Sequence, residues 1–366
     1  GIKKYQWLAM PLALHGVVAK KDGSVVTLAI GEKPEDPVFY ISDLLPHLGH
    51  EQMSKRASEF VEAELLDVIV GNRPLVIDKS DTAGKGDSKA ASKKDAASAS
   101  ADSADDDEAH DAKKKPVKAL VLQLLAEQYG IDEEDFLSAE IEVVPAGPAR
   151  DCGFDRSMIV AYGHDDRVCA YPSLRAQLAC KKPARTAVTL LCDKEEIGSV
   201  GATGMTSHFF EDAMAEILQL AGESDPLALR RCLAHSRMLS SDVSAAFDPS
   251  YASVYEPKNA CYLGHGLTFN KFTGSRGKSG SNDADAEYLA LVRRIMDDAD
   301  VAFQTSELGK VEAGGGGTIA YILATYGMQV VDSGLPVLSM HAPWEVVSKA
   351  DIYEAYRGYQ AFLAAE

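Results

Sequence analysis

The chain has 366 residues, 46% of them hydrophobic and 25% charged, a composition typical of a folded protein large enough for two domains. Its 55 acidic residues outnumber its 37 basic residues, and the formal net charge of −18 argues against nucleic acid as a partner. No apolar run reaches the ~20 residues that span a bilayer, and the six widely spaced cysteines contain no C-x-x-C pair, so we expect a cytoplasmic protein without membrane contact, disulfides or a thiolate zinc site.

The first part of the chain predicts a β-rich domain over residues 1–137. Two apolar runs, 4–19 and 24–30, flank the sequence Lys-Lys-Asp-Gly-Ser, and Asp-Gly is the strongest short hairpin signal. We expect a helical stretch near 51–67. Residues 79–115 form a low-complexity tract of Lys, Ala, Ser and Asp that cannot bury enough apolar surface to fold by itself. We interpret this tract as a solvated insertion rather than an interaction tail.

A helix is predicted from Pro116 to Gly130, because apolar residues recur there with helical spacing, and we assign that face to a core. From about residue 138, short apolar strands alternate with helices, which predicts an α/β sheet flanked by helices over 138–366. The expected elements are a strand at 158–162, a helix from 166, a strand at 186–192, a helix at 206–221, strands at 328–332 and 335–340, and a last helix capped by Ser348 and Asp351, whose aromatic face we assign to the core.

Acidic and imidazole side chains follow the predicted strands of this α/β part. They are Asp165, the neighbours Glu195 and Glu196, Asp242, and His341. Functional sites of open α/β sheets lie at the carboxyl ends of strands. Carboxylates with one imidazole suit a hydrolytic zinc or manganese centre, in which one of two adjacent glutamates binds metal while the other accepts a proton from water. Solvated acidic loops are the alternative interpretation.

Six motifs in order give the chain a family resemblance. They are GHDDRVCAY, DKEEIGSVGATG, SSDVSAAFDPSY, FTGSRGKSGSNDADAE, SELGKVEAGGGGTIA and LPVLSMHAPWEV. Together they resemble the bacterial branch of the aspartyl aminopeptidase family, which are dinuclear zinc exopeptidases. The resemblance covers nearly the whole chain outside the low-complexity tract. It implies a zinc-exopeptidase-like catalytic domain with a β-rich inserted domain that mediates dimer contacts.

The resemblance also implies a role for each candidate residue. Asp165 looks like the carboxylate that bridges two metal ions, followed by a cis peptide bond to Asp166. Glu196 and His341 would complete one ion, and Asp242 would bind the other. Glu195 would be the general base that activates a water shared by two divalent ions, which we expect to be zinc, with cobalt or manganese as alternatives.

Residues toward the substrate are also suggested by the resemblance. Lys271, with Arg276 and Lys278, matches a basic segment near the substrate pocket, although a solvated basic turn is the alternative. Gly316 and Gly317 belong to a glycine run that lets backbone approach a ligand, or else begins a helix. His47 best resembles a histidine that reaches the active site of a neighbouring subunit, and a loop histidine without function is the alternative.

The family's remaining zinc ligand is a histidine in a His-x-Asp motif ahead of the stretch equivalent to GIKKYQW, with which this chain begins. We therefore expect an upstream portion of the catalytic domain that carries this ligand. The family assembles dimers into a tetrahedral dodecamer, which we expect here.

The sequence thus predicts a metallo-aminopeptidase that removes amino-terminal residues from peptides, with a preference for Asp or Glu suggested by the family name. Two alternatives remain: a catalytically incomplete assembly or scaffold subunit, and a dinuclear deacylase that acts on acylated amino acids.

Overall fold

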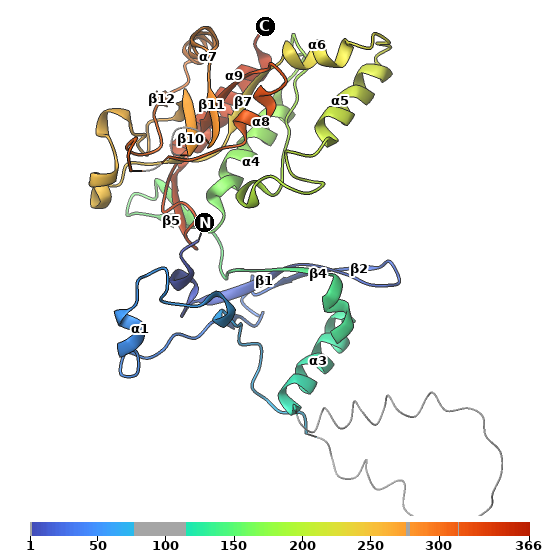
Figure 1. Cartoon of the computed structure of the whole chain (residues 1–366), viewed down its shortest axis with the longest axis vertical. Coiled ribbons are helices and arrows are strands. Elements are labelled where there is room, and N and C mark those ends of the chain that lie inside the picture. Colours follow the sequence, from blue (N-terminus) through green and yellow to red (C-terminus); the bar gives the residue numbers. More distant parts are fainter. Residues whose placement is uncertain (1, 77–114, 276–278, 314) are drawn as a thin grey trace, which may run out of the picture. The chain divides into compact units, whose positions relative to one another are not determined.

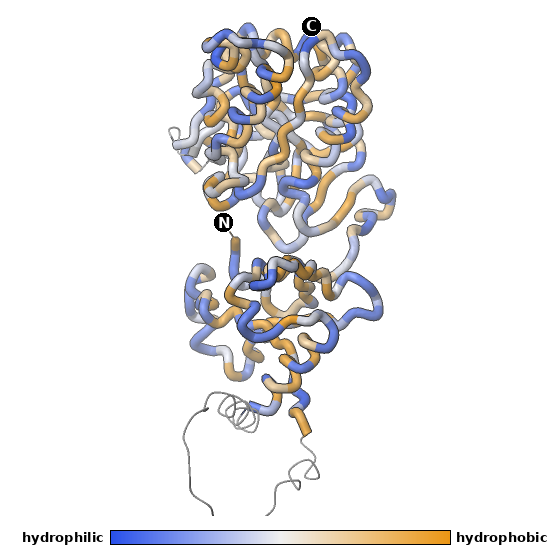
Figure 2. Tube along the Cα trace, turned by 90° about the vertical axis from the view of Figure 1, so that its right-hand side faces the viewer, coloured by the Kyte–Doolittle hydropathy of each residue, from blue (hydrophilic) through white to orange (hydrophobic). Residues whose placement is uncertain are grey.

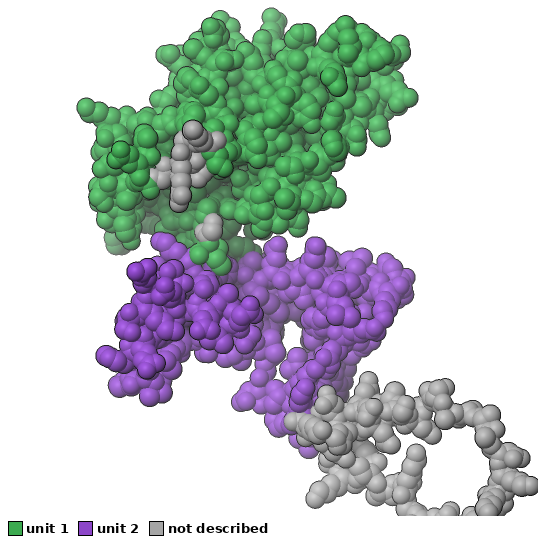
Figure 3. Space-filling model, viewed as in Figure 1, with its two compact units in different colours: residues 1–2, 148–366 green, residues 3–147 purple. Residues whose placement is uncertain are grey.

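The computed structural model describes residues 2–76, 115–275, 279–313 and 315–366. The chain divides into two compact units, one over residues 3–147 and one over 148–366 that also includes Ile2 (Figure 3). Nearly all of the predicted insertion at 79–115 lies outside the described residues, as do Arg276 and Lys278.

The smaller unit is built on a four-stranded antiparallel sheet (Figure 1). Its central strand β1 (Pro11–Ala19) pairs with β2 (Val25–Ile30), β3 (Phe39–Tyr40) and β4 (Ala139–Pro145). The β1–β2 pairing confirms the predicted hairpin. Because β4 pairs with β1 along seven residues, the unit extends past residue 137, where the sequence placed the domain boundary, and ends at Gly147.

The helical segments of this unit differ in part from the expectation. Residues Lys4–Trp7 form a 3-10 turn (η1) rather than the start of the first strand. The helix expected at 51–67 is limited to α1 (His50–Ser54) and the turn η2 (Ala63–Leu65). Most side chains in this stretch are exposed, so a longer helix would have no buried face to stabilise it.

The predicted helix after residue 115 is α3 (Pro116–Tyr129), and it ends at Gly130, whose φ of 65° is the left-handed conformation that glycine adopts readily. A short 3-10 segment, η3 (Glu133–Ser138), then leads into β4. Helix α3 consists mostly of hydrophobic residues (Figure 2), yet none of its described side chains is fully buried. The face assigned to a core is therefore only half-buried in this chain.

The described residues of the larger unit form two main sheets, one hairpin and six helices. One sheet has the order β12 (Phe303–Thr305), β9 (Leu267–Asn270), β13 (Gln329–Gly334), β7 (Arg237–Ser241). The other has the order β5 (Arg150–Cys152), β6 (Met158–Ala161), β15 (Glu345–Ser348), β14 (Pro336–Leu338), β8 (Ser244–Ala245). The hairpin joins β10 (Phe272–Ser275) to β11 (Ser279–Asp283). The described helices are α4 (His164–Ala179), α5 (Phe209–Leu220), α6 (Ala228–Ala234), α7 (Ala286–Asp298), α8 (Ala320–Ala324) and α9 (Lys349–Ala364), with 3-10 turns at η4 (Glu195–Ile197), η5 (Pro249–Val254) and η6 (Pro257–Asn259).

Two consecutive valines of β13 show how helices cover both faces of its sheet. Val331 packs in a core formed with α4, α7 and α9, whereas Val330 packs in a second core formed with α5, α6 and α8. Successive side chains of a strand point to opposite faces, so the sheet is a layer between two groups of helices. This confirms the predicted α/β arrangement. The aromatic face of α9 also lies in the first core, with Tyr359 buried.

Two local predictions for this unit are wrong. Residues 186–192 are partly buried but have no regular secondary structure, no described strand pairs with them, and the isolated bridge Asp193–Gly204 follows. An apolar extended run becomes a strand only when a neighbouring strand accepts its hydrogen bonds. Ser348 makes no side-chain cap at α9, and the Asp351 carboxylate instead accepts the N–H groups of Gly264 and Gly266.

All six cysteines lie in the described part of the chain and are free thiols, as expected. Among the described residues, no helix is long and apolar enough to cross a membrane.

Candidate metal centre

Strand ends of the larger unit carry three of the residues predicted to bind metal, Asp165, Asp242 and His341. Strand β6 leads through Gly163, with a φ of 66°, into Asp165 in the first turn of α4. The backbone at Asp165 is not helical, and the expected cis peptide bond joins it to Asp166. Strand β14 leads into His341, which is itself in the left-handed region with a φ of 64°.

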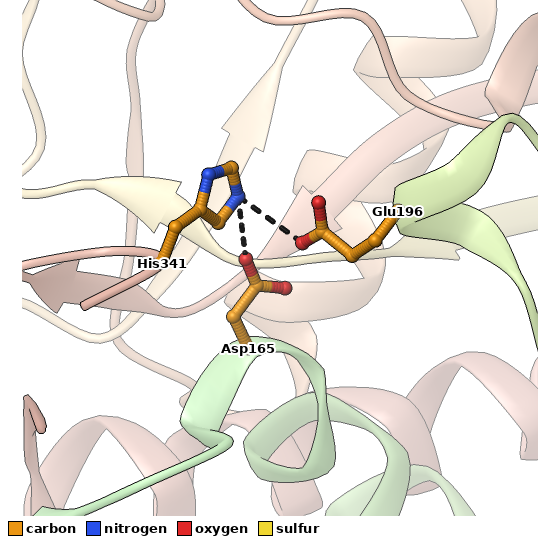
Figure 4. A group of neighbouring side chains, drawn as sticks. All are labelled: Asp165, Glu196 and His341. Carbon is orange, nitrogen blue, oxygen red and sulfur yellow. Dashed lines mark ion pairs between the residues drawn. The ribbon is translucent and has the colours of Figure 1, made fainter. Parts of the chain in front are cut away.

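A first group of ligands consists of Asp165, Glu196 and His341 (Figure 4). His341 Nε2 lies 3.0 Å from an Asp165 carboxylate oxygen and 3.1 Å from a Glu196 carboxylate oxygen. One atom from each of the three residues falls within 4.8 Å of the others, a spacing that could hold an ion. Glu196 comes from the turn η4, which follows Lys194 at a φ of 67°.

A second group of ligands consists of Asp165, Asp166 and Asp242, also with ligand atoms within 4.8 Å of one another. Asp242 follows the end of β7, and its N–H donates to the carbonyl of Ser333 at 3.0 Å. Gly334 packs so closely on this segment that a Cβ there would lie 1.5 Å from the Asp242 carbonyl oxygen. Asp165 belongs to both groups, which is the position of a bridging carboxylate.

The electrostatics of the second group fit a bound cation. Burial, followed by repulsion from neighbouring carboxylates, raises the pKa of Asp242 well above its usual range, and burial also raises the pKa of Asp166. Asp166 Oδ1 is buried and has no hydrogen-bond partner among the described residues. A buried carboxylate oxygen without a partner is costly, and a divalent ion would satisfy it. The donor set of carboxylates and imidazole also suits zinc.

His341 compensates part of the negative charge of the first group. Hydrogen bonds to Asp165 and Glu196 raise the pKa of His341 to about 10, and the bond to His341 lowers the pKa of Glu196 to about 2. Burial raises the pKa of Asp165, while its hydrogen bond to His341 opposes that shift. The positively charged imidazolium of His341 thus offsets part of the repulsion between the Asp165 and Glu196 carboxylates.

Glu195 lies beside the first group but belongs to neither set of ligands. Burial, and then repulsion from Glu196 and Asp165, raises the pKa of its carboxyl group. A carboxylate whose pKa moves toward neutrality is a better proton acceptor for a water attacking a peptide bond. Glu196 thus belongs to the first group of potential ligands, whereas Glu195 lies outside both groups.

The structure does not gather all of the predicted substrate residues. Lys271 Nζ pairs with Asp283 at 2.5 Å, next to the β10–β11 hairpin. Gly316 and Gly317 precede α8, and the Gly316 carbonyl accepts the N–H of Gly274 in β10. His47 is exposed in the smaller unit.

His164, Asp165 and Asp166 also fit a His-x-Asp pattern. The His164 side chain, however, is buried, with Nε2 3.3 Å from the carbonyl of Ile159, and it belongs to neither group of ligands.

Two carboxylates of this region were not predicted as functional from the sequence. Asp166 was expected only as the partner in the cis bond, although its position next to Asp165 at a strand end was a usable signal. Glu345 received no role, yet its side chain is fully buried and accepts the backbone N–H groups of Asp165 and His341. Since glutamate is rarely buried, no sequence pattern pointed to it.

Comparisons with known proteins identify the family to which the chain is related. Residues 1–363 match the family described as Aminopeptidase I zinc metalloprotease (M18). "Probable M18 family aminopeptidase 1" of Clostridium acetobutylicum is 54% identical over 363 residues, which are 99% of this chain and 71% of that protein.

Solved structures show the same relationship. The crystal structure of aminopeptidase I from Clostridium acetobutylicum is 52% identical with a TM-score of 0.84, covering 100% of this chain and 72% of that one. The M18 aminopeptidase of Thermotoga maritima is 43% identical with a TM-score of 0.86, covering 99% and 73%. The S. cerevisiae mApe1 dodecamer, at 20% identity and a TM-score of 0.64 over 98% and 69%, shares the fold. The chain therefore belongs to the M18 family of zinc metallo-aminopeptidases, which are hydrolases of the exopeptidase class.

Proposed function

We propose that Asp165 bridges two zinc ions, with Glu196 and His341 on one ion and Asp242 on the other. The observation that carries this proposal is the membership of Asp165 in both groups of potential ligands. Asp166, whose buried Oδ1 has no partner among the described residues, faces the second ion in this proposal. The second group holds only carboxylates among the described residues, so a histidine from a His-x-Asp segment outside these 366 residues would complete it.

The chain's own residues would carry the proton transfers of peptide hydrolysis. A bound zinc pair would polarise the scissile carbonyl and lower the pKa of the attacking water. Glu195 would accept the proton of that water and deliver it to the leaving amine. Its raised pKa supports this assignment, because the protonated carboxyl group must persist long enough to donate.

Substrate recognition and assembly complete the proposal. The substrates are peptides from which amino-terminal residues are removed, and an acidic first residue would meet Lys271, although Asp283 competes for that ammonium group. Gly316 and Gly317 would contact the substrate backbone.

In the smaller unit, large hydrophobic side chains are exposed over residues 44–76, including Leu48 at 70% and Met53 at 71%. Such an apolar surface supports a dimer contact, which would carry His47 to the partner's site and allow a dodecamer like that of mApe1. The cytoplasmic location stays a prediction.

The test uses the 366-residue chain with zinc and a panel of aminoacyl p-nitroanilides that includes Asp, Glu, Leu and Lys, with N-acetyl amino acids alongside. Release of nitroaniline that stops on chelation supports the peptidase. Glu195→Gln should keep its zinc and lose about 10²- to 10⁴-fold in kcat. Glu216→Gln, an exposed change on α5, is the matched control. Turnover of N-acetyl amino acids alone would favour the deacylase. Zinc binding without turnover would favour the scaffold if the chain stays inactive when the His-x-Asp segment is also supplied.

A further inference from the structure

Glu345 is a charged side chain in an unusual place. It begins β15 and is 2% exposed, among the largest fully buried side chains of the described chain. Glutamate is almost never buried to this degree unless both of its oxygens are satisfied. The partners of this carboxylate should therefore reveal why it is retained.

The sheet order places Glu345 between the two turns that carry proposed ligands. Strand β15 lies between β6 and β14 and is antiparallel to both. Its first residue therefore lies beside the final residues of these two neighbours, as the pairing of Glu345 with Ala161 shows. The turns that begin there lead to Asp165 from β6 and to His341 from β14.

The two oxygens of Glu345 hold one turn each. Oε2 accepts the backbone N–H of Asp165 at 3.0 Å, and Oε1 accepts the backbone N–H of His341 at 2.8 Å. The same two residues approach each other through their side chains, at 3.0 Å (Figure 4). Glu345 thus joins the main chains of two ligands whose side chains must meet on one ion.

We propose that Glu345 is a positioning residue of the metal centre, which fixes the separation of Asp165 and His341 before an ion binds. This inference rests on the proposed function. His341 has a φ of 64°, a conformation that a non-glycine residue keeps only when its surroundings define it, and the bond to Glu345 supplies that definition. Groups that orient metal ligands typically change metal affinity 10- to 100-fold when they are removed.

The geometry predicts which replacements of Glu345 cannot accept both backbone N–H groups. Glutamine has nearly the same volume, but it offers one acceptor oxygen and turns an N–H₂ group toward the second backbone N–H. Aspartate keeps the charge, but it is one methylene shorter and reaches only one of the two turns. Both changes should loosen the link between the turns of Asp165 and His341, while all proposed ligand side chains remain present.

Asp351 provides a matched control. It is 1% exposed, and its two oxygens accept the backbone N–H groups of Gly264 and Gly266 at 2.8 and 2.7 Å. Asp351→Asn therefore removes the same kind of bond from a loop that holds none of the proposed ligands.

The experiment measures the affinity of the full 366-residue chain for Zn²⁺ by competition with a chromogenic chelator, below the melting transition of each variant. We expect Glu345→Gln and Glu345→Asp to lower the zinc affinity of the site that includes His341 by about 10- to 100-fold. Asp351→Asn should bind zinc with the same affinity as the unsubstituted chain. Zinc in excess should restore occupancy in both Glu345 variants.

Wild-type affinity in both Glu345 variants, with a lower melting temperature like that of Asp351→Asn, would show that Glu345 only stabilises the fold and would overturn the inference. Failure of the unsubstituted chain to bind zinc would instead contradict the proposed function.

Discussion

Replacing Asp242 with asparagine should stabilise the metal-free chain and abolish part of its response to zinc. The folded-state pKa of Asp242 is raised by burial and by the charges of Asp166 and Asp165. A carboxyl group with a raised folded-state pKa contributes stability below its unfolded pKa, near 3.8, and that contribution is lost as the pH rises through the folded pKa. At pH 7, well above the unfolded pKa, burial of Asp242 therefore destabilises the fold without metal relative to low pH, because the unfolded chain ionises this carboxyl group freely and the fold opposes that ionisation; an amide has no such cost.

Zinc should stabilise the unsubstituted chain more than Asp242→Asn, which opposes the advantage of this variant without metal. An ion present at 100 times its dissociation constant raises the free energy of unfolding by about 2.7 kcal/mol. For a unit the size of residues 148–366, that gain corresponds to a rise of roughly 5–11 °C in melting temperature. Asp242→Asn loses a ligand of the second ion, so its rise on zinc addition should be smaller than that of the unsubstituted chain.

Thermal unfolding followed by circular dichroism, at pH 5 and pH 7 with chelator or zinc, measures both effects. Asp298→Asn, an exposed change on α7, has the same effect on net charge and serves as the control. If metal-free Asp242→Asn melts below the unsubstituted chain at pH 7, or gains as much as that chain from zinc, the electrostatic account of the second group is refuted.

One further substitution and one measurement on the unsubstituted chain test the same centre. Gly334→Ala would place a Cβ 1.5 Å from the Asp242 carbonyl oxygen, so the segment must move; elemental analysis should find less zinc per chain, and full occupancy would contradict the role of this close packing. Zinc binding at pH 8 should release at least about one proton, because the pKa of His341 is about 10 in the metal-free chain and the ligand binds as neutral imidazole. Binding heats measured in two buffers of different ionisation enthalpy count the protons, and a buffer-independent heat would exclude a protonated His341.

Local patterns predicted the parts of the fold that depend on neighbouring residues. The Asp-Gly hairpin and the helix that ends at Gly130 are present because turn and cap chemistry acts over a few positions. The strand expected at 186–192 and the boundary at residue 137 depended on pairing between distant segments. The partner of β4 is β1, more than a hundred residues earlier, and no local pattern specifies that choice.

The candidate site likewise contains residues that the sequence could predict and one residue that it could not. Asp165, Asp242 and His341 could be proposed as ligands because functional residues gather at strand ends, and Asp165 and His341 lie within ligand spacing of Glu196, although Glu196 follows a segment that forms no strand. Glu345 could not be found, because its importance lies in two backbone N–H groups that only the folded sheet aligns.

The positive φ values around the centre connect these observations. Gly163 precedes Asp165, Lys194 precedes the two glutamates, and His341 is itself left-handed. Each turn thus contains a residue in the left-handed region, and at Lys194 and His341 that conformation costs free energy. Three short turns with carboxylates close together would separate in the absence of a cation unless other groups held them. His341 supplies positive charge, the sheet supplies the framework, and Glu345 ties two of the turns to it. We therefore expect the centre to be arranged before metal binds, at a cost in stability that a bound ion would offset.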